Sequence, residues 1–332
     1  MADETSLIVT VLNEARTIRH WLATLDSLTT RPDELVVCDG GSTDGTADIL
    51  REWAENASFP VNVIVAQGAN ISEGRNIAIT AARGPWIAIT DAGTTLDVDW
   101  LGGLIAARAD TEVVSGFFYP TGSTLFERVL ATMITFTRDE IDPQTFLPSS
   151  RSLMIHKDAC ISVGGYPEWL DYCEDLVFDF NLRAAGHTFR FAPDALVSWS
   201  ARPTVRSFYK QYYRYARGDG KAGLWPRRHA VRYAIYGVGV AIIALMPMGI
   251  VGTLLAVGAG GLIYHFRYFR RLMKSTRLTV SEKAIGVALV PFLGTVGDVA
   301  KMCGYPAGLY WRRQYYAEIS KKPRPVGALA QA

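Results

Sequence analysis

The chain has 332 residues, which is too long for one small domain and enough to bury a sizeable core. Its 34 Lys and Arg residues nearly balance its 32 Asp and Glu residues, so the overall charge does not favour nucleic acid as a partner. The four cysteines are scattered without a CxxC pair, which fits neither a zinc site nor a disulfide framework and predicts reduced thiols.

Short apolar runs alternate with helical patterns through the first third of the chain. Such alternation predicts an α/β fold with parallel strands, because each crossover between parallel strands needs a helix. Ligands of such sheets bind beyond the carboxyl ends of the strands. The predicted strands are Leu7–Leu12, Leu35–Cys38, Val61–Val65 and Trp86–Thr90, and the predicted helices are Ala15–Leu28, Thr43–Glu55 and Ser72–Ala82.

Polar residues follow three of these strands. Asn13 and Glu14 end the first, Asp39 and a glycine-rich turn end the second, and Asp91 ends the fourth. We expect them to meet at one crevice suited to a ribose, a base edge and a metal-bridged diphosphate. A simpler alternative is that residues 42–44 only cap the next helix. The turn lacks the GxGxxG spacing of nicotinamide-binding folds, which disfavours an oxidoreductase.

Two segments resemble glycosyltransferase family 2. They are Val37–Thr46, with Asn13-Glu14 ahead of it, and Gly74–Ala88. The resemblance implies a GT-A fold, which is a Rossmann-like and mostly parallel sheet flanked by helices, and an inverting transfer from a nucleotide-sugar donor. It also implies that Asp39 contacts the base and that Arg75 and Asn76 line the nucleotide site, with Asn13 and Glu14 also at the donor. A solvated helix residue is the alternative for Arg75.

The metal motif of this family is Asp-x-Asp, but here it reads Asp91-Ala92-Gly93. The resemblance implies a divalent cation, Mg²⁺ or Mn²⁺, with Asp91 as one ligand. Divalent cations that bridge phosphates prefer oxygen ligands and often use one or two carboxylates. Asp97 or Asp99 is a possible substitute for the missing carboxylate, although both more plausibly begin the next helix.

A second pair of segments resembles the acceptor side of the same family. Gly164, Gly165 and Tyr166 are expected to bind the acceptor, and Glu174-Asp175 to open a helix beneath it. The resemblance implies that Asp175 is the catalytic base and that Glu174 orients it or binds acceptor. The alternative is an acidic pair that only stabilises a helix N-terminus.

Two further segments carry basic residues. Arg151 could neutralise a phosphate or an acidic acceptor, or lie on the surface. The segment that begins at Gln211 resembles the Gln-x-x-Arg-Trp motif of membrane-bound relatives, with Tyr215 in the Trp place. Its Arg214 and Arg217 are predicted to hold the leaving diphosphate. Its tyrosines are equally suited to a membrane interface.

The run from Tyr233 to Phe266 contains no Lys, Arg, Asp or Glu. As one helix it would be about 51 Å long, against about 30 Å of hydrocarbon core. Basic residues on both sides favour a hairpin that turns near Pro247 with both ends in the cytoplasm, and one tilted span is the alternative. Ala284–Gly297 is a second apolar run, expected to be interfacial or re-entrant.

These patterns predict a cell-membrane enzyme with a cytoplasmic catalytic domain, a lipid-bilayer partner and a membrane-associated acceptor. No signal-peptide pattern opens the chain. A non-catalytic membrane subunit that keeps a degenerate nucleotide site is the alternative function. The expected organisation is a transferase domain over 1–204, with a donor half 1–110 and an acceptor half 111–204, then an amphipathic interface helix over 205–232, membrane-associated helices over 233–320 and a flexible basic tail over 321–332.

Overall fold

The computed structural model describes residues 4–245 and 249–319. By the packing of its backbone the chain forms two compact units. The first unit comprises Met1–Pro203 together with Arg267–Val290. The second unit comprises Thr204–Phe266 together with Pro291–Ala332. The expected domain organisation stays a prediction. In the structure, the segment 267–290 groups with the first unit.

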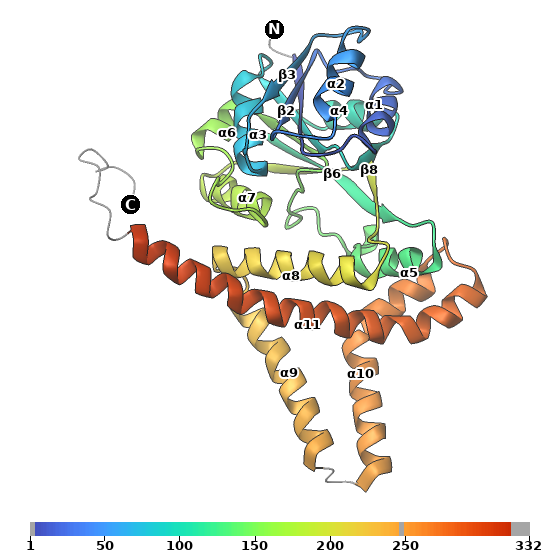
Figure 1. Cartoon of the computed structure of the whole chain (residues 1–332). Coiled ribbons are helices and arrows are strands. Elements are labelled where there is room, and N and C mark those ends of the chain that lie inside the picture. The colour runs from blue at the N-terminus through green and yellow to red at the C-terminus, as the bar shows by residue number, and fades with distance from the viewer. Residues whose placement is uncertain (1–3, 246–248, 320–332) are drawn as a thin grey trace. The chain divides into compact units, whose positions relative to one another are not determined.

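The first unit is an eight-stranded sheet with helices on both faces (Figure 1). The strand order is β3-β2-β1-β4-β7-β6-β8-β5. Its elements are β1 (Thr5–Val11), α1 (Ile18–Asp26), β2 (Glu34–Asp39), α2 (Thr46–Ala54), β3 (Val61–Val65), α3 (Ile71–Ala81), β4 (Trp86–Asp91), β5 (Thr94–Leu96), α4 (Trp100–Ala106), β6 (Val113–Thr121), α5 (Leu125–Ile134), a 3₁₀ turn (Arg138–Glu140), β7 (Leu153–His156), α6 (Lys157–Ser162), α7 (Glu174–Ala184) and β8 (Phe189–Ser200).

The four predicted strands are the parallel half of this sheet. β1 pairs in parallel with β2 and β4, and β2 pairs in parallel with β3. β7 then runs antiparallel to both β4 and β6, and β6 pairs in parallel with β8. The predicted α/β class and mostly parallel sheet are confirmed. Because β1, β2 and β4 are adjacent and parallel, their carboxyl ends lie at one edge of the sheet.

Each face of the sheet carries its own apolar core. One core packs α1, α2 and α4 against the sheet through large buried side chains such as Trp21, Leu50 and Trp100. The other packs α3, α6 and α7 through Ile79, Cys160 and Phe178. α3 begins at a capping box, in which Asn70 accepts from the backbone of Glu73 and the Glu73 carboxylate accepts from the backbone of Asn70. This start fixes the helix that carries Arg75 and Asn76.

The second unit is helical. It contains α8 (Val205–Ala222), α9 (Pro226–Leu245), most of α10 (Gly249–Lys274) and the larger part of α11 (Val280–Ile319). The expected interface helix over 205–232 is two helices, since α8 ends at Gly223, whose φ of 72° is left-handed. The apolar run beginning at Tyr233 is divided between α9 and α10. The expected hairpin and the single-span alternative both stay predictions. The predicted turn at Pro247 lies outside the described residues.

α8 and α11 pack backbone against backbone. A Cβ on Gly304 would lie 2.2 Å from the carbonyl oxygen of Tyr213, and one on Gly308 would lie 2.1 Å from that of Arg217. Only glycine permits this approach. The expected interfacial run 284–297 lies inside the 40-residue α11, which continues past it.

A buried polar cluster joins α9, α10 and α11. Asp298 accepts from Arg232 Nε at 2.8 Å, from Tyr264 Oη at 2.7 Å and from Lys301 Nζ at 3.3 Å. His229, near the start of α9, stacks on Tyr305 of α11 with ring centroids 3.8 Å apart. The buried charge of Asp298 is thus balanced by Arg232 and Lys301 within the helical unit.

Among the residues that the structure describes, two helices are long and apolar enough to cross a membrane by length and composition, namely α10 and α11. Large apolar side chains on α10 are exposed, among them Leu255 at 69% and Ile263 at 76%. Apolar surface of this kind is unfavourable in water and favourable in lipid.

Candidate functional site

The glycine-rich turn after β2 is built around Asp39. The Asp39 side chain is fully buried, and its Oδ1 accepts from the backbone N–H of Gly41 at 2.8 Å and of Ser42 at 2.6 Å. Gly41 has φ +97°, a left-handed conformation that side chains other than glycine rarely adopt. The carboxylate therefore shapes the turn with one oxygen.

The end of β1 is fastened to this turn. Asn13 donates its backbone N–H to Ser42 Oγ at 2.8 Å and accepts at Oδ1 from Thr43 N at 3.0 Å. Glu14 donates its backbone N–H to Thr46 Oγ1 at 2.9 Å. The structure thus brings Asn13, Glu14 and the Asp39 turn together as expected, while their contacts with a donor stay a prediction.

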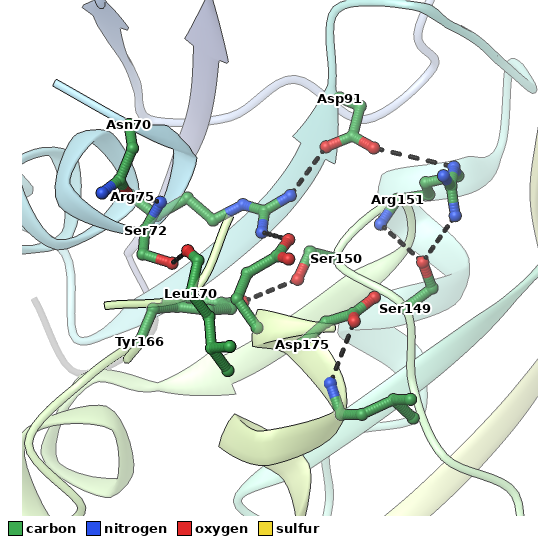
Figure 2. A network of polar contacts seen from close by, with 12 residues as sticks. Asn70, Ser72, Arg75, Asp91, Ser149, Ser150, Arg151, Tyr166, Leu170 and Asp175 are labelled. Atoms are coloured by element: carbon green, nitrogen blue, oxygen red, sulfur yellow. Dashed lines mark hydrogen bonds and ion pairs between the residues drawn. The ribbon is translucent and has the colours of Figure 1, made fainter. Parts of the chain in front are cut away.

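Arg75 on α3 joins two carboxylates that are far apart in the sequence. Its Nη2 donates to Asp91 Oδ1 at 2.9 Å, and its Nη1 donates to Glu174 Oε1 at 2.8 Å. Figure 2 shows the guanidinium of Arg75 reaching Asp91 at the end of β4. The Arg75 side chain is 3% exposed, so the alternative of a solvated surface residue is wrong. Arg75 ties the predicted donor side to the predicted catalytic pair.

The charge of Arg75 is well supported despite its burial. Desolvation alone would lower its pKa, but the carboxylates of Asp91 and Glu174 outweigh that effect and raise the pKa above its usual value. The guanidinium also lies over the ring of Tyr166, 5.1 Å from its centroid. Both terminal nitrogens of the Arg75 guanidinium donate to carboxylates of the protein. The predicted contact of Arg75 with a nucleotide stays a prediction.

Asn76, the next residue on α3, faces the segment that precedes α7. Its Nδ2 donates to the carbonyl oxygen of Tyr166 and to Glu168 Oε1, each at 2.9 Å, and its Oδ1 accepts from Tyr166 N at 2.8 Å. Gly165, at φ +73°, would place a Cβ 2.5 Å from Asn76 Oδ1. The amide therefore positions Gly165 and Tyr166, and its predicted donor contact stays a prediction.

Tyr166 is a core residue in this arrangement. Its ring is 1% exposed and stacks on Phe178 with centroids 4.1 Å apart, and its Oη hydrogen-bonds Ser150 Oγ at 2.9 Å. Burial raises the pKa of its hydroxyl. The acceptor roles predicted for Gly164, Gly165 and Tyr166 stay predictions, because the observed contacts of Tyr166 are all with the protein interior.

Asp91 is the predicted metal ligand, and that role stays a prediction. Its side chain is 27% exposed, and its Oδ2 lies 3.6 Å from Arg151 Nε, which is longer than a hydrogen bond (Figure 2). That oxygen can serve as one ligand of a hydrated cation that is completed by phosphate oxygens and water. Within residues 4–245 and 249–319, no group of three or more His, Cys, Asp or Glu side chains could hold a metal ion.

Asp175 is the predicted catalytic base, and that role stays a prediction. It lies in the first turn of α7 as predicted, beside Glu174. Burial, followed by the adjacent Glu174 carboxylate, raises the pKa of Asp175 to about 6, while Arg75 and Arg151 oppose the shift. A carboxylate with that pKa is ionised at neutral pH yet more basic than an ordinary aspartate.

Asp179, one helical turn after Asp175, was not among the predicted site residues. It is 1% exposed, and burial followed by the charge of Asp175 raises its pKa well above the usual value. The i, i+4 spacing of two aspartates on a predicted helix is the signal that could have indicated it.

Arg151 lies between Asp91 and Trp199, with its guanidinium 5.1 Å from the Trp199 centroid.

Gln211, Arg214 and Arg217 lie on α8, which belongs to the second unit. Gln211 Nε2 donates to Tyr215 Oη at 2.9 Å. Their predicted contacts with the leaving diphosphate therefore stay predictions.

Comparison with known proteins decides the family. Residues 6–162 match the model of glycosyl transferase family 2, and residues 86–279 match that of glycosyl transferase family group 2. The chain belongs to glycosyltransferase family 2. The predicted enzyme class is confirmed: this protein is a glycosyltransferase.

Its relatives include a glycosyltransferase and a succinoglycan biosynthesis protein. It is 26% identical over 227 residues to glycosyltransferase AglE of Haloferax volcanii, covering 66% of this chain and 73% of that protein. It is 26% identical over 271 residues to succinoglycan biosynthesis protein ExoA of Rhizobium meliloti, covering 74% and 81%. The mannosyltransferase PcManGT from Pyrobaculum calidifontis, solved with GDP-Man and Mn²⁺, matches with TM-score 0.58 and 17% identity over 93% of this chain and 88% of that one. The last similarity confirms the GT-A fold.

Proposed function

We propose that this glycosyltransferase moves a sugar from a nucleotide-sugar donor to a membrane-associated acceptor, with inversion at the anomeric carbon. The observation that carries the proposal is the bridge from Asp91 through Arg75 to Glu174. It supports one reaction centre, because Asp91 is the residue suited to the donor diphosphate and Glu174 adjoins the base. The nucleotide of PcManGT and the names of the relatives support the donor class.

In the proposed reaction, Asp175 takes the proton of the acceptor hydroxyl. The acceptor oxygen forms a bond to the anomeric carbon as the bond from that carbon to the diphosphate oxygen breaks. The electron pair of the broken bond leaves with the nucleoside diphosphate on the opposite face. A positioned base of this kind contributes about 10²–10⁴-fold to the rate.

The other residues orient and balance charge. Glu174 is held by Arg75 and keeps the Asp175 carboxylate basic. A divalent cation at Asp91 would neutralise negative charge on the diphosphate. Mn²⁺ in PcManGT supports such an ion here. Arg151, 3.6 Å from Asp91, adds a second positive group beside the same position.

A membrane acceptor is supported by α10 and α11, which are long and apolar enough to cross a bilayer. Arg227, Arg228 and Arg232 precede the apolar hairpin, and basic residues from Arg267 onward follow it. Because basic flanks favour the cytoplasm, we propose that the catalytic unit is cytoplasmic.

The test is transfer by the full-length protein in membranes, with labelled UDP-, GDP- and dTDP-sugars, with and without chelator. We expect nucleotide release from one donor class, lost on chelation and restored by Mn²⁺ or Mg²⁺. Asp175→Asn should abolish turnover and keep donor binding, whereas Asp158→Asn, at a carboxylate 86% exposed on α6, should change neither. Unchanged turnover in Asp175→Asn would remove it as the base.

A non-catalytic subunit is the second candidate, favoured by one observation. Gly93 stands where the family has its second metal carboxylate. Donor binding without turnover across lipid-linked and polysaccharide acceptors would select this candidate.

A further inference from the structure

The last two turns of α10 carry a stripe of basic side chains. Its members are spaced three and four residues apart and so share one face of the helix, namely Arg267, Arg270, Arg271 and Lys274. Asp139, in the 3₁₀ turn after α5, lies 3.4 Å from Arg270 Nη2 and 2.6 Å from Lys274 Nζ. Glu140 lies 2.7 Å from Arg271 Nε. Four cations therefore face two carboxylates, and the stripe keeps an excess of positive charge.

Arg271 is the buried member of this stripe, and one of its nitrogens lacks an acceptor. The side chain is 4% exposed. Its Nε donates to Glu140 and its Nη1 to the carbonyl oxygen of Met133, but its Nη2 has no hydrogen-bond partner among the residues that the structure describes. Buried donors in folded proteins are nearly always paired. The third nitrogen is therefore suited to an acceptor that comes from outside the chain.

A second unpaired polar atom lies in the segment that Arg271 contacts. Besides its bond to Met133, the guanidinium of Arg271 lies 5.1 Å from the ring centroid of Phe136. Thr135 stands between these two contact residues, and its buried Oγ1 likewise has no hydrogen-bond partner within residues 4–245 and 249–319. A guanidinium N–H and a hydroxyl that are both unpaired suit an anion with several acceptor oxygens, such as a phosphate.

The stripe ends a helix that is long and apolar enough to cross a membrane. Ile263 and Phe266, just ahead of it in α10, are 76% and 66% exposed, and Phe136 is 50% exposed. Basic residues at the end of an apolar helix lie at the level of the lipid headgroups, where anionic lipids attract them. The phosphate most abundant at that level is the phosphate of a phospholipid.

We propose that the C-terminal end of α10 binds the headgroup phosphate of an anionic phospholipid. Arg271 Nη2 and Thr135 Oγ1 donate hydrogen bonds to the phosphate oxygens. Arg267 and Arg270, both exposed, balance the charge of the headgroup. The half-exposed ring of Phe136 turns away from the guanidinium as the phosphate enters. This site depends on neither the sugar donor nor the acceptor, so it goes beyond the proposed function.

The test is native mass spectrometry of the full-length protein, released from detergent that contains equimolar phosphatidylglycerol and phosphatidylcholine. We expect the anionic lipid to be retained about tenfold or more over the zwitterionic one. Excess inorganic phosphate should not displace it, because free phosphate has no acyl chains to place in the apolar layer. Arg267→Gln and Arg270→Gln should each reduce the preference about fivefold.

Thr135→Val separates a binding role from a structural one. The variant keeps the shape of the side chain and removes only the hydroxyl. If Thr135 served the fold alone, losing an unpaired buried hydroxyl would raise the melting temperature and leave the lipid preference unchanged. At the proposed site the preference should fall about five- to tenfold, because a hydrogen bond to a charged group is lost.

Arg51→Gln is the matched control, at an arginine 55% exposed on α2, and should leave the lipid preference unchanged. Thermal unfolding of each variant separates lost binding from lost folding, and the exposed Arg267 decides if Thr135→Val does not fold. Equal retention of the two lipids, displacement by inorganic phosphate, or an unchanged preference in both Arg267→Gln and Thr135→Val would overturn the inference. Each of these results would leave the proposed function standing.

Discussion

The guanidinium of Arg75 lies between the carboxylates of Asp91 and Glu174, 2.9 Å from one and 2.8 Å from the other. These partners come from the end of β4 and the start of α7, so one buried cation connects two parts of the sheet edge. Removing one member of a buried ion pair leaves an uncompensated charge, which is strongly destabilising.

We therefore expect Arg75→Gln to lower the free energy of unfolding by about 3–5 kcal/mol and to reduce turnover at least about 100-fold. Thermal unfolding and initial rates measure the two effects. Arg19→Gln is the control, because the Arg19–Glu52 pair is 65% and 68% exposed and should contribute at most about 1 kcal/mol. Similar losses in both variants would contradict a special role for Arg75.

The pH dependence of the rate should report Asp175. Its pKa is raised to about 6, and the base form is the ionised one, so the rate should fall as pH decreases through about 6. Glu174→Gln removes a neighbouring negative charge and should move this fall to lower pH. Rate profiles from pH 5 to 8 measure the shift. An unmoved or upward-shifted profile would contradict the assignment, and Glu52→Gln should leave the profile unchanged.

Asp179 should make the protein less stable as pH rises. Burial raises its folded-state pKa, so the carboxyl keeps its proton in the folded state while the unfolded chain loses it. The sign follows from proton linkage: the contribution is full below the unfolded pKa of about 4 and decreases above it. Asp179→Asn should raise the melting temperature at pH 8 more than at pH 4. Equal changes at both pH values would exclude this cause.

The positions of many site residues could be predicted from the sequence, because they depend on short segments that form strand ends, turns and helix starts. Strand ends, glycine turns and the start of α7 are set by short segments, so Asp39, Asp91 and Asp175 could be placed before the fold was known. Partners across long separations could not. Nothing local indicates that Arg75 pairs with Glu174, 99 residues away, or that Gln67 rests on Gly41.

The pairing of residues 267–290 with the sheet does not follow from the sequence pattern. The basic residues of this segment are typical of the flank of a membrane helix. In the fold, Arg271 is 4% exposed, and its Nε donates to Glu140 Oε2 at 2.7 Å. Arg128 pairs with Glu282 in the same unit. Tertiary pairing, rather than composition, decides where these residues belong.

The ion pair between Arg271 and Glu140 anchors residues 267–290 to the rest of the first unit. Arg271 also donates Nη1 to the carbonyl oxygen of Met133 at 2.8 Å, so Arg271→Gln leaves Glu140 and that carbonyl without a cation. We expect the catalytic unit to lose about 3–5 kcal/mol of stability. Lys274→Gln is the matched control, since Lys274 and its partner Asp139 are each 50% exposed, and it should cost at most about 1 kcal/mol.

Thermal unfolding of the full-length protein in detergent, followed by the near-ultraviolet signal of the tryptophans, measures both variants. A truncation after residue 204 gives an independent result, because it removes 267–290 entirely. That fragment should unfold at a lower temperature than Arg271→Gln, since it loses Arg271, Lys274 and Glu282 together. A fragment as stable as the full-length protein would show that residues 267–290 do not stabilise the catalytic unit. That result would contradict the stabilising role of the Arg271–Glu140 pair.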